Sequence, residues 1–143
     1  MVPARISLVT LGSRDIQVMR NFYRALGWEE STLSSEGFAM FKTSGGVLAL
    51  FLLDLLAADA NAMPTRAAGA FKGVTLAINV ERREQVDEAI AAARAAGARI
   101  VKDPEDASWG GRSAYFGDPE DNLWEVAWLP DASFDERGGM IVP

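Results

Sequence analysis

Glu125 is the residue of this chain best placed to do acid–base chemistry. It lies in the stretch Gly111–Trp128, GRSAYFGDPEDNLWEVAW. The segment Asp118–Asn122 predicts a tight turn, because proline fixes φ at about −65° and Asp and Asn hydrogen-bond their own backbone. Aromatic and β-branched segments flank the turn, which predicts a β-hairpin. Because side chains alternate along a strand, the second arm has one face with Leu123, Glu125 and Ala127 and another with Trp124, Val126 and Trp128.

The tryptophan and valine face suits packing against a helix, which leaves Glu125 on the opposite surface. Three interpretations of this carboxylate are open. In the first it is a structural group, paired with an arginine such as Arg112. In the second it is a lone general base or cation acceptor, with a pKa raised by apolar neighbours. In the third it is a residual metal ligand.

The composition excludes several kinds of chemistry. The 143 residues include no histidine and no cysteine, so there is no imidazole base, no imidazole ligand, and no thiolate ligand or nucleophile. We therefore expect any metal to be held by oxygen atoms alone, and we predict no cofactor. The net charge of −6 argues against nucleic acids and anionic membranes as partners, and favours neutral or cationic ligands.

The apolar runs are too short for a membrane span. The longest, Val47–Leu53, is well below the ~20 residues needed and suits a buried strand. The N-terminus lacks the hydrophobic region and cleavage site of a signal peptide. These features predict a cytoplasmic protein without a membrane partner.

The elements that position Glu125 occur twice along the chain. Each copy is predicted as strand, helix and three strands, and the two hairpins superpose at an offset of 75 residues, with Phe41 on Phe116. The predicted organisation is an N-terminal module (1–53), a connector with at most a helical turn (54–72), a C-terminal module (73–130) and a tail (131–143).

The first copy comprises a strand at Arg5–Leu11, a helix from Ser13 or Asp15 to Gly27, a short strand at Trp28–Thr32 and a hairpin of Gly37–Thr43 and Val47–Leu53. The second comprises a strand at Gly73–Val80, a helix at Gln85–Ala96, a short strand at Arg99–Lys102 and the hairpin already described.

Four stretches carry a family resemblance: ISLVTLGSRD, NFYRALGW, GVTLAINV and RSAYFGDPEDNLWEVAW. They resemble the vicinal oxygen chelate superfamily, which includes glyoxalase I, extradiol dioxygenases and bleomycin-resistance proteins, and the resemblance covers Arg5–Pro130. It implies an α+β fold in which two βαβββ modules form a cup-shaped mixed sheet with helices outside. The family's metal ligands, carried over by spacing, fall on Leu8, Leu50, Thr75 and Glu125. One carboxylate and one hydroxyl are too few for a catalytic divalent ion, so we expect no metal site.

Alternation along the strands predicts the side chains that face the cup. In the first module these are Ile6, Leu8, Thr10, Phe38, Met40, Leu48, Leu50 and Leu52; in the second they are Thr75, Ala77, Asn79, Ser113, Tyr115, Leu123 and Glu125. From this set, Glu125 and Tyr115 are predicted to be catalytic. Residues predicted to bind substrate are Thr75, Asn79, Trp109, Ser113, Leu8, Leu50 and Phe38.

Three of these assignments have alternatives. Tyr115 and Ser113 are either ligand contacts or residues that serve packing alone. Trp109 is either a lid over the cup or a surface aromatic that fixes its loop. The large apolar side chains of the first module either line the cup or fill it as core.

Two functional hypotheses follow. In the first, the protein is a metal-independent, glyoxalase-like enzyme of lyase or isomerase type, with Glu125 as the lone acid–base residue and Tyr115 or Ser113 stabilising an oxyanion. In the second, it sequesters a small molecule without turnover, as bleomycin-resistance proteins do. Uncovered sheet edges also predict a homodimer.

Overall fold

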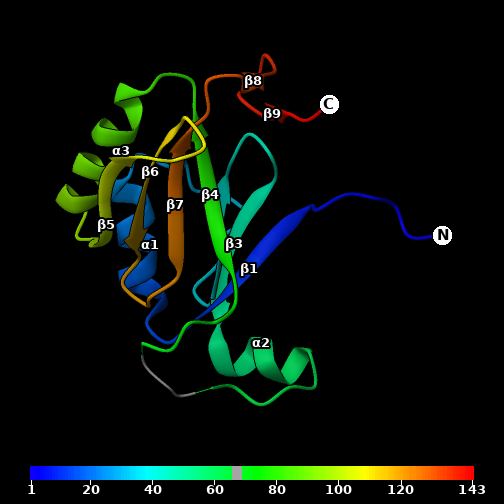
Figure 1. Cartoon of the computed structure of the whole chain (residues 1–143). Coiled ribbons are helices and arrows are strands. Elements are labelled where there is room, and N and C mark those ends of the chain that lie inside the picture. The colour runs from blue at the N-terminus through cyan, green and yellow to red at the C-terminus, as the bar shows by residue number, and fades with distance from the viewer. Residues whose placement is uncertain (66–68) are drawn as a thin grey trace. The chain divides into compact units, whose positions relative to one another are not determined.

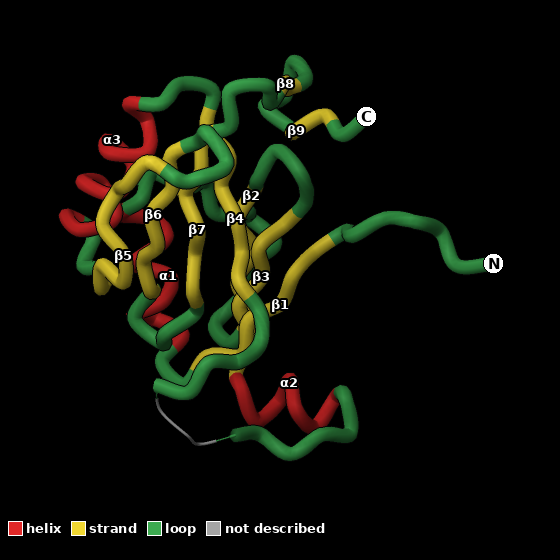
Figure 2. Tube along the Cα trace, viewed as in Figure 1, coloured by secondary structure: helices red, strands yellow, loops and turns green. Residues whose placement is uncertain are grey.

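The chain contains both helices and strands in the computed structural model, which describes residues 1–65 and 69–143 (Figure 1). The chain divides into two compact units, Met1–Arg66 and Ala67–Pro143. Helices and mixed sheets occur in both units (Figure 2), which confirms the predicted α+β class. Residues 66–68 of the predicted connector lie outside the described residues.

The first unit is a mixed sheet with a helix packed on it. Strand β3 lies centrally, parallel to β1 and antiparallel to β2. Helix α1 begins after Asp15, whose carboxylate accepts a hydrogen bond from the Val18 amide at 3.1 Å, an N-cap of the predicted kind. The Tyr23 ring of this helix lies 5.6 Å from the ring of Phe41. The elements are β1 (Leu8–Ser13), α1 (Ile16–Ala25), β2 (Phe38–Lys42), β3 (Val47–Leu52) and α2 (Leu53–Asp59).

The face assigned to the middle of β3 by sequence was wrong. Phe41 pairs with Leu48 and Ala39 with Leu50, and directly opposed residues of an antiparallel pair share a face. Leu48 and Leu50 therefore lie with Phe41 on the side covered by α1, and Leu50 has no exposed surface.

The reason is the length of the hairpin turn. Phe41 pairs with Leu48 in the first unit, whereas Phe116 pairs with Trp124 in the second. The offset between the two hairpins is therefore 75 residues on the first strand and 76 on the second. The counterpart of Glu125 is accordingly Ala49, one residue before Leu50.

Helix α2 occupies part of the predicted connector and is longer than the expected helical turn. It follows β3 directly and covers the end of β1, where a Cβ on Gly12 would lie 2.6 Å from Cδ1 of Leu53. The small size of Gly12 thus makes room for the helix. The short strand predicted at Trp28–Thr32 is reduced to a single bridge between Glu30 and Phe41.

The second unit is a four-stranded sheet with α3 packed on one face, as Figure 1 shows for α3, β5 and β6. Strand β7 lies between its parallel neighbour β4 and its antiparallel neighbour β6, and β5 forms the outer edge beyond β6. Trp124 and Val126 are buried, and the Trp124 ring stacks on Phe116 at 6.3 Å. The predicted helix-facing side of β7 is thereby confirmed. The elements are β4 (Thr75–Val80), α3 (Glu84–Ala95), β5 (Arg99–Asp106), β6 (Arg112–Gly117), β7 (Leu123–Trp128), β8 (Ser133–Phe134) and β9 (Met140–Ile141).

The turn between β6 and β7 is held by the side chain of Asp118. Its Oδ1 accepts hydrogen bonds from the amides of Glu120 (3.0 Å) and Asn122 (2.9 Å), and its Oδ2 accepts one from the Asn122 side chain (2.8 Å). Asp121 takes a left-handed conformation, with φ 61°, which Asp tolerates. This closed turn fixes the hairpin register and so determines which residue lies opposite Glu125.

Strand β5 is longer than predicted. It continues from Arg99 to Asp106 instead of ending at Lys102, and its pairing with β6 is interrupted by two register shifts, one between Ile100 and Lys102 and one between Lys102 and Glu105. These irregularities are β-bulges, which change the face on which the following side chains lie.

Candidate functional site

The face of the second sheet opposite α3, called here the distal face, carries three rows of residues in register across four strands. Neighbouring residues of a row come from β5, β6, β7 and β4, in that order. The central row is Lys102, Tyr115, Glu125 and Ala77. The flanking rows are Arg99, Gly117, Leu123 and Thr75 on one side and Glu105, Ser113, Ala127 and Asn79 on the other.

Apart from Trp109, the site residues predicted from the second module lie in these rows. Glu125 and Tyr115 are directly opposed and half-buried. Thr75 and Asn79 lie on β4, and Ser113, which is 5% exposed, lies on β6. The structure thus brings together five of the predicted site residues on one face of one sheet.

The predicted residues of the first module belong to the other unit. Leu8 is 43% exposed at the start of β1. The Phe38 ring lies 5.7 Å from that of Phe51, on the sheet face opposite Leu50. Leu50 is fully buried on the face that α1 covers, so its side chain has no surface with which to contact a ligand.

Tyr115 is kept protonated by its surroundings. Burial raises the pKa of its phenol, and the charge of Glu125 and a hydrogen bond with that carboxylate raise it further, against a smaller opposing effect of Lys102. At neutral pH the row therefore holds a neutral hydroxyl donor beside Glu125. A carboxylate with a hydroxyl donor beside it is an arrangement suited to proton abstraction next to a carbonyl group.

Lys102 completes the central row and was missed by sequence. Its ammonium lies 2.7 Å from the Glu105 carboxylate. Hydrogen bonding to Glu105 raises the pKa of Lys102, and the negative charges of Glu105 and Glu125 add to this effect. Alternation from Ile100, which pairs with the buried Phe116, assigns Lys102 to the helix face, and only the bulge reverses that assignment.

The interpretation of Glu125 as the partner of Arg112 was wrong. Arg112 lies on the α3 side, where its Nε and Nη2 each donate to Asp87 at 2.8 Å and its Nη1 donates to Asp106 at 3.2 Å. The hydrogen bond from Arg112 is the main reason that the pKa of Asp87 is lowered. This ion-pair cluster joins α3 to the sheet and leaves Glu125 on the distal face.

Trp109 lies in the turn between β5 and β6, with 52% of its surface exposed. A Cβ on Gly111 would lie 1.8 Å from the Trp109 ring and 2.3 Å from the Trp128 carbonyl oxygen. The indole therefore packs directly on the backbone of Gly111, as expected of an aromatic that fixes its loop. A role for Trp109 in binding a ligand stays a prediction.

The side chains present do not fit the family's metal site. Leu8 and Leu50 have no ligating atoms, and the corrected register replaces Leu50 by Ala49, which has none either. Within residues 1–65 and 69–143, no group of three or more Asp and Glu side chains is arranged to hold a metal ion. At the family's four positions only the Thr75 hydroxyl and the Glu125 carboxylate could bind a metal, which is fewer ligands than such a centre uses.

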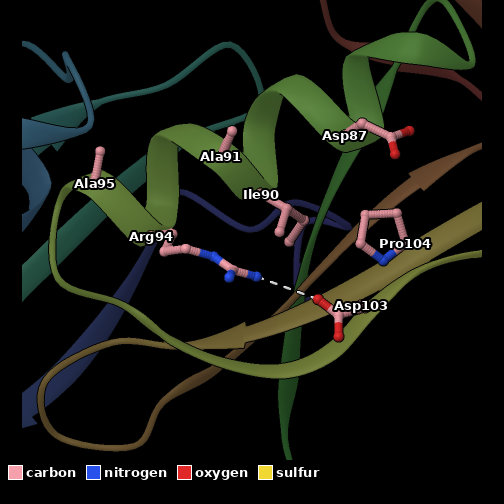
Figure 3. Close-up of a pocket in the computed structure, with 7 residues that line it drawn as sticks. All are labelled: Asp87, Ile90, Ala91, Arg94, Ala95, Asp103 and Pro104. Atoms are coloured by element: carbon pink, nitrogen blue, oxygen red, sulfur yellow. Dashed lines mark hydrogen bonds and ion pairs between the residues drawn. The ribbon is translucent and has the colours of Figure 1, made fainter.

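An open groove of about 440 Å³ lies between β5 and α3, away from the distal face (Figure 3). The ion pair between Arg94 and Asp103 crosses it at 3.2 Å. It contains none of the predicted site residues. Its lining consists of Asp87, Ile90, Ala91, Arg94, Ala95, Asp103 and Pro104.

The repeated helix-on-sheet units and the Glu125 strand define a class of protein. The chain belongs to the glyoxalase/bleomycin resistance protein/dioxygenase superfamily, whose family model matches residues 5–126. This confirms the resemblance seen in the sequence. Among curated proteins, none is detectably similar to the chain. Within the described residues, no helix is long and apolar enough to cross a membrane.

Three solved structures place the chain among its relatives. A glyoxalase-related enzyme from Fulvimarina pelagi is 25% identical, with a TM-score of 0.87 over 98% of this chain and 99% of that one. A glyoxalase/bleomycin resistance protein/dioxygenase family enzyme from Burkholderia phytofirmans is 25% identical, with a TM-score of 0.73 over 88% of this chain and 99% of that one. A lactoylglutathione lyase from Agrobacterium tumefaciens is also 25% identical, with a TM-score of 0.67 over 89% and 95% of the two chains.

Proposed function

We propose that this protein is a glyoxalase-like enzyme that binds a small organic carbonyl compound on the distal face and moves a proton with Glu125. The observation that supports the proposal most is the direct opposition of Glu125 and Tyr115 in the central row. The relatives described as a glyoxalase-related enzyme and a lactoylglutathione lyase favour an enzyme of lyase or isomerase type.

The proposed step is proton abstraction from the carbon next to the carbonyl group. The Glu125 carboxylate takes the proton, and the electron pair of the C–H bond forms the carbon–carbon double bond of an enolate. The Tyr115 hydroxyl turns from Glu125 to the enolate oxygen and donates a hydrogen bond. Glu125 then returns the proton to a carbon, which gives an isomer or epimer and restores the carboxylate. No metal takes part in this scheme.

The two residues contribute to the rate in different ways. A positioned general base accounts for roughly 10²–10⁴-fold, and a single oxyanion donor for roughly 10²–10³-fold. Glu125→Gln should therefore abolish most of the activity, because the amide cannot accept the proton, whereas Tyr115→Phe should leave a measurable remainder.

Hydrogen–deuterium exchange of carbonyl compounds in D2O, followed by proton NMR, tests the proposal. We expect wild-type protein to accelerate exchange at the carbon next to the carbonyl and Glu125→Gln to lose that acceleration while retaining the compound. Glu88→Gln on the exposed surface of α3 is the matched control and should behave as wild type. Equal exchange rates with wild type and Glu125→Gln would contradict the proposal that the protein is an enzyme.

A sequestering protein is the second candidate. It is favoured by the small side chains around the central row, since Ala77, Ser113 and Ala127 leave space without adding a second acid. In that case Glu125→Gln should lower the affinity for a bound compound, measured by calorimetry, while neither protein catalyses exchange.

We also propose that the protein is a cytoplasmic homodimer. Among the described strands, β4 pairs only with β7 and so has one edge without a strand partner, and such edges favour association. Light scattering of the purified protein should give twice the mass of one chain, and cell fractionation should recover it with the cytosol. A monomeric mass at micromolar concentration would contradict the dimer.

A further inference from the structure

Lys102 lies in the same row as the proposed catalytic pair, although neither the regular alternation of β5 nor the family motifs place it there. We propose that Lys102 determines substrate specificity by binding a carboxylate, so that the substrate is a small 2-oxo acid or a close analogue. This inference rests on the proposed function, because it names the class of carbonyl compound on which Glu125 acts.

The first bulge of β5 aims Lys102 at the distal face. Ile100 pairs with Phe116, so a regular strand would pair Val101 with Tyr115 and turn Lys102 toward α3. The register instead shifts by one residue, and Lys102 pairs with Tyr115. Bulges are common beside functional sites, where they re-aim a side chain.

The second bulge supplies Lys102 with its partner. A regular continuation would pair Pro104 with Ser113, but the second shift pairs Glu105 with Ser113. Glu105 thereby reaches the distal face and forms the 2.7 Å ion pair with Lys102. The two irregularities together place a cation, Lys102, at the edge of the central row, next to an acidic partner, Glu105, that a ligand carboxylate could replace in the ion pair.

The ion pair is easy to replace. The side chains of Lys102 and Glu105 are 45% and 58% exposed, and ion pairs in water contribute little net stability because solvent screens them. A substrate carboxylate can therefore take the place of Glu105 at a small free-energy cost. The acidic composition of the whole chain predicted neutral or cationic ligands, whereas this edge of the site carries a cation, Lys102, that Glu105 neutralises until a ligand replaces it.

The order of groups along the row matches a 2-oxo acid. Lys102, Tyr115 and Glu125 lie on three successive strands, and neighbouring strands are about 4.8 Å apart. A carboxylate at Lys102 would be followed by the carbonyl oxygen at Tyr115 and by the carbon that loses its proton at Glu125. The electron pair of that C–H bond forms the carbon–carbon double bond, the π electron pair of the carbonyl group moves onto its oxygen, and the proton goes to Glu125, so the step needs no other reactant.

The test compares 2-oxobutanoate with its methyl ester, which keeps the carbonyl group but lacks the charge. Exchange of the C3 protons is measured in D2O by NMR for wild type, Lys102→Met, Lys102→Arg and the control Lys42→Met, which removes a similarly exposed lysine paired with Glu29 in the first unit. We expect Lys102→Met to raise KM for the acid about tenfold or more, with kcat much less affected and the ester unchanged. Lys102→Arg should retain most of the preference for the acid, and Lys42→Met should match wild type.

The outcomes separate this inference from the proposed function. If Lys102→Met affects both probes equally, or neither, while Glu125→Gln still abolishes exchange, the role of Lys102 is wrong and the proposed function stands. If wild type accelerates the exchange of neither probe but exchanges other carbonyl compounds, the 2-oxo acid assignment is overturned and the proposed function stands. A preference of wild type for the ester would also overturn the carboxylate assignment.

Discussion

The hydrogen bond between Tyr115 and Glu125 gives each group a definite role. A phenol beside a carboxylate holds its proton more tightly, because loss of that proton would place two negative charges side by side. Burial acts in the same direction and is the larger effect on the pKa of Tyr115. Tyr115 is therefore a hydrogen-bond donor throughout the neutral range, and Glu125 is the group available to take a proton.

This arrangement predicts how Tyr115 titrates. Its pKa should lie above the ordinary value of about 10, and Glu125→Gln should lower it, because the amide carries no charge. The near-ultraviolet absorbance of the phenolate, followed against pH, measures the midpoint. Tyr115→Phe identifies the signal, since the only other tyrosine is the buried Tyr23, and Glu88→Gln should leave the midpoint unchanged. An identical midpoint in wild type and Glu125→Gln would contradict the coupling.

At the scale of elements, α3 is tied to its sheet by an ion-pair cluster as well as by its apolar face. Arg112 is only 15% exposed and joins Asp87 of α3 to Asp106 of β5. Arg83 binds the same Asp106 at 2.6 and 2.8 Å. Because Arg112 donates two parallel bonds to Asp87, this contact has the geometry of the stronger kind of ion pair.

Replacement of Arg112 should therefore destabilise the second unit. Arg112→Met removes the charge but keeps an apolar chain, and we expect a loss of about 1–3 kcal/mol in the free energy of unfolding, because both acids lose a partner. Arg94→Met breaks the exposed pair with Asp103 and should cost less than about 0.5 kcal/mol. Urea denaturation measures both variants, and equal losses would show that burial of Arg112 is unimportant.

Regular elements were predictable from the sequence, and irregular ones were not. The β6–β7 hairpin was predicted correctly because Trp124 and Val126 contrast with Glu125 across the strand. Strand β3 offered no such contrast, since Val47–Leu52 is apolar on both faces. The turn between β2 and β3 is also one residue shorter than the turn between β6 and β7, which shifted the register of β3. Helix α2 was underestimated because it is short and has no side-chain N-cap.

The candidate site divides in the same way. Thr75, Asn79, Ser113, Tyr115 and Glu125 lie on regular strands, and simple alternation placed them together. Lys102 lies after a bulge, and alternation assigns such a residue to the wrong face. A proline and two acidic residues between Lys102 and Asp106 made the continuation of β5 hard to recognise. The register shifts of β5, which make alternation assign Lys102 to the wrong face, are also what places this cation on the distal face.

At the scale of the whole molecule, each unit has a carboxylate group that arginines hold in its charged form. In the first unit, burial alone would raise the pKa of Glu30, but hydrogen bonds from Arg24 and Ser34 and the charge of Arg20 outweigh it, so the pKa is lowered. In the second unit, the pKa of Asp106 is lowered chiefly by its hydrogen bond from Arg83. Asp87 is lowered in the same way by Arg112.

These lowered values predict how stability depends on pH. A carboxyl group with a lower pKa in the folded than in the unfolded state binds fewer protons when folded, so it stabilises the fold above its unfolded pKa. That contribution is lost as the pH falls through the folded value, in a window beginning at about pH 4–5 for Asp and Glu. Stability should therefore be nearly constant around neutral pH and fall as the pH is lowered through that window.

The acid dependence should be traceable to the two units separately. Glu30→Gln leaves Arg20, which is 13% exposed and 2.5 Å from Glu30, without its charged partner, and should cost about 2–4 kcal/mol at neutral pH. Because the missing carboxylate can no longer be protonated, the variant should lose less of its remaining stability than wild type on acidification. Urea midpoints between about pH 7 and pH 3 measure this, and amide exchange should show the loss in β1–β3 for Glu30→Gln and in β4–β7 for Asp87→Asn. A wild-type stability that rises on acidification from neutral pH to about pH 4 would show that these ion pairs do not control the acid limit of the fold.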